Sequence, residues 1–244
     1  SVVHAVTAED ELVVEPWIKY LDGFTKKAKS GAIKSYLTIV HEVFINHQFI
    51  ANKNVTWRVD GDDFQIDFDQ ELIAILDSVH IQDQGYRNQL GSIEEKYGRN
   101  SEEMKAHWQL IHKTDSINLI QIRKILDERG WLGPKVIGNQ GNSTLFLVIQ
   151  HADLETQSNY LPMMREAVKL NNAKASSLAL LEDRVALRQG KRQIYGSQIG
   201  RDPQSGVYYV SPLVEPEKVN ERRAEVGLGT IESYIQNWNM TWDV

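Results

Sequence analysis

Residues 100–130, NSEEMKAHWQLIHKTDSINLIQIRKILDERG, decide the fold class. Their apolar side chains recur at intervals of three and four residues, which is the spacing of one face of an α-helix. Asn100 followed by Glu103 fits a helix-capping box, and Gly130 is a typical helix stop. We therefore expect one long helix with an apolar stripe. The stripe consists of Trp108, Ile111, Ile122, Ile125 and Leu126.

The chain before this helix divides into two parts. Residues 69–98 continue the helical pattern, with Asp69 as the expected N-cap and a break near Gly91. Helical spacing also covers residues 15–47, whereas the alternation over residues 55–68 predicts a β-hairpin. We therefore expect an N-terminal module of helices and a hairpin over residues 1–68, followed by a helical domain over residues 69–244.

The chain after Gly130 predicts helices and a second hairpin. Residues 145–150 are apolar on every side, which indicates a buried helix with Ser143 or Thr144 as its cap. Helices are expected at 154–170 and 174–189, and strands are expected at 192–199 and 207–213, on either side of a turn at 202–206. The predicted fold class is mainly α, with a C-terminal β-hairpin that covers a polar pocket. Pro216 is expected to start a last helical stretch.

Composition excludes several classes of protein. A length of 244 residues allows one large or two small domains, and no apolar run approaches the roughly 20 residues of a membrane-spanning helix. We therefore expect a soluble chain without membrane insertion. A net charge of −6 disfavours a nucleic-acid-binding protein, and the absence of cysteine excludes disulfides and thiolate nucleophiles. The first residue is Ser1 rather than Met, which fits a cloned fragment but favours an exported bacterial protein that has lost its leader.

His151 is the first candidate for chemistry. It follows the apolar run, and Asp153 and Gln157 lie shortly after it. An imidazole beside a carboxylate can act as a general base, because the carboxylate orients the ring and stabilises its charged form. The alternative is a helix-end histidine next to a surface carboxylate.

Asp183 is the second candidate, because its helical neighbours Ala179, Leu180, Ala186 and Leu187 are all apolar. A buried carboxylate needs a partner, which could be structural or could belong to a site.

The polar strand with Gln193, Tyr195 and Gln198 is the third candidate, and it could equally be a solvated face of the hairpin.

Basic residues are concentrated between positions 183 and 201, where the sequence has five cationic residues and one acidic residue, Asp183. Guanidinium groups bind carboxylates and phosphates, although a solvated basic helix end is the common alternative. The pairs Asp83/Arg87 and Asp115/Asn118 are expected on helix surfaces, unless their faces turn inward. The five cations are Arg184, Arg188, Lys191, Arg192 and Arg201.

No motif predicts a cofactor or a metal ion. The chain contains no phosphate-binding loop, no EF-hand and no His-Glu-x-x-His. The helical metal phosphohydrolases use a contiguous His-Asp pair, whereas His151 and Asp153 are separated by one residue. We therefore expect no cofactor and no bound metal.

In combination, these motifs resemble an uncharacterised bacterial domain family of unknown function. The pattern is Asp-Gln-x-x-Arg at Asp83, His-Ala-Asp at His151, Asp-Arg at Asp183, and Gln-x-Tyr-Gly-Thr-Gln at Gln193, followed by Arg-Arg and Gly-Leu. Ser197 replaces the usual Thr and keeps the hydroxyl. The resemblance covers about residues 69–244 and implies that the polar residues form one site, but it supplies no activity.

The function expected from the sequence is an enzyme of hydrolysis or group transfer that acts on a small anionic or amide-bearing substrate. His151 would be the general base or nucleophile, with Asp153 or Asp183 orienting it. The alternatives are a non-catalytic module that binds a ligand or peptide, with the N-terminal module contacting a protein partner, and a structural polar network without a ligand. The expected substrate-binding residues are Arg87, Gln157, Arg184, Gln193, Tyr195 and Gln198.

Overall fold

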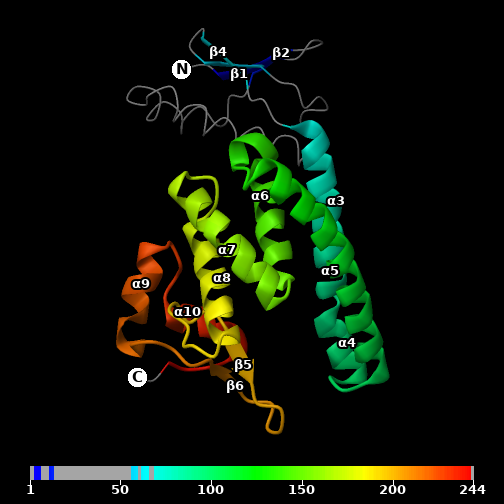
Figure 1. Cartoon of the computed structure of the whole chain (residues 1–244), viewed down its shortest axis with the longest axis vertical. Helices are drawn as coiled ribbons and strands as arrows, with labels where there is room; N and C mark the ends of the chain where they lie inside the picture. The colour runs from blue at the N-terminus through cyan, green and yellow to red at the C-terminus, as the bar shows by residue number, and fades with distance from the viewer. Residues whose placement is uncertain (1–2, 7–10, 14–55, 60–61, 66–68, 243–244) are drawn as a thin grey trace. The chain divides into compact units, whose positions relative to one another are not determined.

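The computed structural model of the 244-residue chain is mainly helical and carries a small antiparallel hairpin near its C-terminus (Figure 1). It describes residues 3–6, 11–13, 56–59, 62–65 and 69–242. The helices expected at residues 15–47 lie outside these ranges. Among the described residues, no helix is long and apolar enough to cross a membrane.

The chain divides into two compact units. One comprises Ser1–Ile75 and Pro134–Gly141, and the other comprises Leu76–Gly133 and Asn142–Val244. The boundary that the sequence predicts after residue 68 stays a prediction.

The first unit contains a four-stranded antiparallel sheet in the order β2-β1-β3-β4. Strands β3 and β4 pair Thr56 with Gln65 and Val59 with Asp62, within the segment where a hairpin is expected. The first two strands have no counterpart in the sequence-based expectation. The strands are β1 (Val3–Val6), β2 (Glu11–Val13), β3 (Thr56–Val59) and β4 (Asp62–Gln65).

Three helices follow the sheet: α3 (Gln70–Arg87), α4 (Leu90–Tyr97) and α5 (Glu102–Arg129). The expected cap of α3 is confirmed, because the Asp69 carboxylate accepts a hydrogen bond from the Leu72 amide at 3.0 Å. The expected cap of α5 is wrong by one residue. Ser101 lies in the extended region and its hydroxyl accepts from the Met104 amide at 3.1 Å, so Asn100 precedes the helix.

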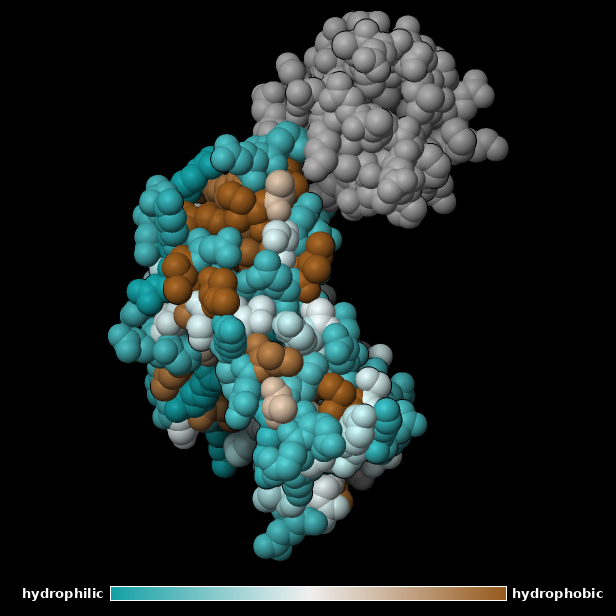
Figure 2. All heavy atoms as spheres, turned by 90° about the vertical axis from the view of Figure 1, so that its right-hand side faces the viewer, coloured by the Kyte–Doolittle hydropathy of each residue, from teal (hydrophilic) through white to brown (hydrophobic). Residues whose placement is uncertain are grey.

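The buried face of α5 differs from the predicted stripe at two places. Trp108 is 42% exposed, because the buried face instead runs through Met104, His107 and Ile111. Asn118 is fully buried, so the expectation of a surface position is wrong for this residue. The outward face keeps some apolar side chains, and Figure 2 shows hydrophobic groups interspersed with hydrophilic ones on the side of the molecule that it presents.

Helix α6 (Pro134–His151) begins well before the expected cap at Ser143 or Thr144. Gly138 has φ 70° and ψ 170°, values that glycine adopts readily, so the chain bends there and continues as a helix. Pro134 occupies the first turn, where its missing N–H costs nothing. The helix delivers His151 at its C-terminal end.

Helices α7 (Leu154–Lys169) and α8 (Ala175–Arg188) pack against each other, close to their predicted bounds. The hairpin of β5 (Ile199–Arg201) and β6 (Tyr208–Val210) is shorter than expected, because residues 192–198 form irregular backbone. Helices α9 (Val219–Glu225) and α10 (Ile231–Ile235) close the chain against the hairpin. Their shared core consists of Leu213, Val219, Ile231 and Ile235.

Candidate functional site

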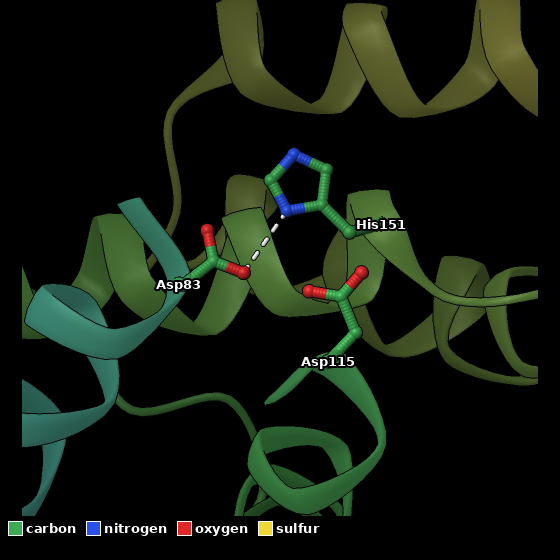
Figure 3. Close-up of side chains that lie close together, drawn as sticks. All are labelled: Asp83, Asp115 and His151. Carbon is green, nitrogen blue, oxygen red and sulfur yellow. Dashed lines mark hydrogen bonds and ion pairs between the residues drawn. The ribbon is translucent and has the colours of Figure 1, made fainter. Parts of the chain in front are cut away.

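Three helices bring a histidine and two carboxylates together (Figure 3). His151 at the end of α6 lies with its Nδ1 atom 3.1 Å from Oδ1 of Asp83 on α3. Asp115 on α5 completes the group, and one ligand-type atom from each side chain lies within 4.8 Å of the others. Asp83 is 1% exposed, although the sequence suggested a surface position, so the α3 face that carries it turns inward. The pairing of His151 with a carboxylate therefore exists, but its partner is Asp83.

Arg87 binds both carboxylates. Its two terminal nitrogens donate to Asp83 Oδ1 at 3.1 Å and to Asp115 Oδ2 at 2.8 Å, and one of them also donates to the Asp83 carbonyl. Gln84 donates to the other oxygen of Asp83 at 2.7 Å. Burial raises the pKa of Asp83, but the hydrogen bond and charge of His151, with the charge of Arg87, outweigh burial and hold it below its usual range. Asp83 is therefore ionised at neutral pH and accepts a hydrogen bond from the His151 Nδ1–H group.

The other ring nitrogen of His151 is open. Nε2 makes no hydrogen bond to any residue that the structure describes, and in Figure 3 it points away from both carboxylates. When the ring is neutral, its proton lies on Nδ1, where it is shared with Asp83, and Nε2 then holds a free lone pair. The His151 side chain is 18% exposed, so part of the ring can be reached from solvent.

A hollow of about 230 Å³ lies beside the histidine. Its floor is partly apolar, with Leu119 and Val148, while the titratable groups in its lining come from α3, α5, α6 and the start of α7. No arginine or lysine belongs to this lining. The titratable groups are Asp83, His112, Asp115, His151 and Asp153.

The spacing of Asp83, Asp115 and His151 is also one that could hold a divalent ion. The guanidinium of Arg87 already bonds to both carboxylates and compensates part of their negative charge. A metal ion would have to compete with this bridging guanidinium for the same carboxylates. The expectation that the site binds no metal stays a prediction.

Three of the expected substrate-binding or basic residues instead fix the backbone around His151. Gln157 and Arg184 donate to the Gln150 carbonyl at 2.8 and 3.2 Å, and Arg188 donates to the Ala152 carbonyl at 2.7 Å. These carbonyls flank His151 at the end of α6, where helical carbonyls lack partners within the helix. The three side chains therefore hold the histidine in position.

The two carboxylates expected to orient His151 have other partners. Asp153 is the N-cap of α7 and accepts from the Thr156 amide at 2.8 Å. Asp183 is fully buried and accepts from the backbone amides of Ile194 at 2.6 Å, Tyr195 at 3.0 Å and Ser197 at 2.9 Å. The Asp183 carboxylate thus holds the irregular segment before β5 onto α8.

Gln193 and Gln198 extend this network. The Gln193 side-chain amide donates to the backbone carbonyls of Gln198 and Ser211 at 3.0 and 2.8 Å, and its oxygen accepts from the backbone N–H of Gln198 at 2.9 Å. The Gln198 side chain accepts from Arg184 at 3.2 Å, which connects the network to the carbonyl beside His151. Tyr195 contributes its backbone: its N–H donates to Asp183 and its carbonyl accepts from Arg223.

Sequence reasoning missed the partner of His151 because Asp83 lies 68 residues away along the chain. The available signal was Asp83 with Arg87 on one face of a helix, which the sequence assigned to the surface. Sequence reasoning placed Arg223 only in the Arg-Arg motif, whereas the structure shows that it is buried and donates to the carbonyls of Tyr195 and Gly229.

Comparison with known proteins places this region in a family. Residues 66–243 match the model described as a family of unknown function, DUF6624. The chain belongs to this family. The expected membership in a domain family of unknown function is thereby confirmed, and the DUF6624 region includes every residue of the site described above. No curated protein and no solved structure matches the chain.

Proposed function

We propose that the protein is a hydrolase or group-transfer enzyme in which His151 acts as the general base on an amide-bearing substrate. The observation that carries the proposal is the Asp83–His151 pair, whose Nε2 atom is open beside a hollow. A histidine whose Nδ1–H is bound to a buried carboxylate has the correct tautomer for proton abstraction by Nε2.

The reaction proceeds by proton transfer through Nε2. His151 accepts a proton from a water molecule as the water oxygen bonds to the amide carbon, which gives a tetrahedral intermediate. The intermediate collapses with cleavage of the C–N bond, and the imidazolium returns its proton to the leaving nitrogen. In group transfer, an acceptor hydroxyl or amine takes the place of water. Asp83 stabilises the imidazolium throughout.

Of the two substrate classes that the sequence suggests, the amide-bearing one has the better support. The donors expected to bind an anion already have partners: Arg87 bonds to two carboxylates, and Arg184 bonds to a carbonyl and to Gln198. A guanidinium group that already has partners binds an anion less readily, because its existing hydrogen bonds would first have to break.

The test is release of ammonia or amine from a panel of small amides by the wild-type protein, His151→Ala, Asp83→Asn and a control, Glu166→Gln. Glu166 is exposed on α7 and bonds to Lys169, so its replacement should leave turnover unchanged. Loss of the general base should lower kcat by roughly 10²- to 10⁴-fold. Full turnover by His151→Ala would refute the proposal, and saturable binding of amides without any turnover would support the non-catalytic binding module.

A second measurement needs no substrate. The ¹⁵N signals of the His151 ring should show a proton on Nδ1 in the wild-type protein, because Asp83 accepts it. Asp83→Asn should weaken this preference, since an amide can also donate to Nδ1 and favour the opposite tautomer. A ring that is protonated on Nε2 in the wild-type protein would contradict the assigned role.

A further inference from the structure

The hollow beside His151 adjoins a second and larger one. The second hollow measures about 360 Å³ and lies along the start of α7 and the end of α5. Asp153 belongs to the lining of both, so the two hollows neighbour each other at this residue. A substrate whose amide lies beside His151 would enter the second hollow if it reached past Asp153.

The second hollow is acidic and has a fixed hydrogen-bonding floor. Asp127, Asp153 and Glu155 contribute carboxylates, against the single guanidinium of Arg123. The phenol of Tyr160, a residue that is 6% exposed, donates to Asp127 at 2.6 Å. Because Tyr160 holds Asp127 in place, this carboxylate is presented to a ligand in a defined position.

Charge is unbalanced over the two hollows together. Five carboxylates and one guanidinium, that of Arg123, line them. Arg87 bonds to Asp83 and Asp115, and Arg188 lies near Asp153. The linings themselves are therefore net negative. The five carboxylates are Asp83, Asp115, Asp127, Asp153 and Glu155.

Apolar side chains also line both hollows. Leu119 and Val148 line the first hollow, and Met163 lines the second. A short aliphatic chain can contact such side chains while its charged end remains among carboxylates.

We infer that the substrate is an amide that carries a positively charged amine on a short aliphatic arm, with the amine among Asp127, Asp153 and Glu155. The inference rests on the proposed function for the position of the reacting amide. The basic cluster of the sequence had suggested an anion, but Arg184 and Arg188 direct their hydrogen bonds to the carbonyls on either side of His151. The charge that remains available at the hollows is negative.

The test measures binding of three amides whose side chains are positively charged, neutral and negatively charged: the N-acetyl amides of lysine, norleucine and glutamate. Binding is followed by calorimetry on the full chain at 20 and 200 mM salt. We expect the lysine amide to bind most tightly and the glutamate amide least. Higher salt should weaken the lysine complex, because the Debye length falls from roughly 20 Å to about 7 Å over this range.

Glu155→Gln removes one carboxylate of the second hollow, and Glu166→Gln removes the same charge from the same helix outside both hollows. Glu155→Gln should weaken the lysine amide about three- to fivefold, which is the size expected for a partly exposed charge pair, and should leave the norleucine amide unchanged. Glu166→Gln should change neither.

The outcomes separate this inference from the proposed function. A charge preference for the lysine amide without turnover supports the cationic ligand and refutes the enzyme. Turnover with equal or tighter binding of the glutamate amide supports the enzyme and overturns the cationic ligand. Failure of the lysine amide to bind at millimolar concentration, or equal effects of Glu155→Gln and Glu166→Gln, would also overturn the inference.

Discussion

Replacement of Asp183 by Asn tests whether this carboxylate is the structural link between α8 and the hairpin. Asn has almost the same volume as Asp, so the exchange opens no cavity. It has one acceptor oxygen where the carboxylate has two, and its NH₂ group must face a backbone N–H. In the native protein the two oxygens accept from the amides of Ile194, Tyr195 and Ser197.

The expected loss follows from these hydrogen bonds. At least one buried N–H loses its acceptor, at a cost of about 1–3 kcal/mol, and the remaining bonds lose the assistance of a full charge. Together these effects should lower the free energy of unfolding by about 3–5 kcal/mol, similar to breaking a buried charged pair. For a chain of this size the corresponding fall in Tm is about 6–20 °C.

The assay is thermal unfolding followed by circular dichroism, with Asp202→Asn as a matched control. Asp202 also accepts from two backbone amides, those of Gln204 and Ser205, but it lies in an exposed turn where water can replace the lost acceptor. Its replacement should therefore lower Tm far less. Equal melting of Asp183→Asn and the wild-type protein would show that the carboxylate is not the link described here.

Three further predictions concern caps, pH and metals. Ser101→Ala removes the cap of the 28-residue helix α5 and should cost about 0.5–2 kcal/mol in urea unfolding, whereas Asn100→Ala should cost much less, and the reverse order would contradict the assigned cap. Folding lowers the pKa of Asp83, so its contribution to the free energy of unfolding should be complete above about pH 5 and should disappear as the pH falls through the folded-state pKa. If wild type and Asp83→Asn differ in this free energy by the same amount at about pH 2 and pH 7, the reasoning is refuted. In the Arg87→Met variant both carboxylates lack their cation, so Zn²⁺ at a hundredfold excess over its Kd should raise Tm by about 5–10 °C. Zn²⁺ should leave the Tm of the wild-type protein unchanged.

Local patterns allowed much of the helical architecture to be predicted. The apolar spacing predicted α3, α5, α7 and α8, because the amphipathic pattern of a helix depends only on residues three and four positions apart in the sequence. The same reasoning failed for the start of α6, since a helix that bends at Gly138 shows no continuous period. It also overestimated the hairpin, because residues 192–198 are held by a side chain of α8 and have no partner strand along most of their length.

The sequence by itself determined which segments are helical, that Asp183 needs a partner, and that His151 ends a buried helix. The tertiary structure alone decided what those polar groups do. It paired His151 with Asp83 from 68 residues away, turned Asp115 and Asn118 inward, and directed Arg184 to a backbone carbonyl instead of a ligand. The physical reason is that helix formation depends on neighbours three and four residues away, whereas the partner of a buried charge depends on which helices pack together.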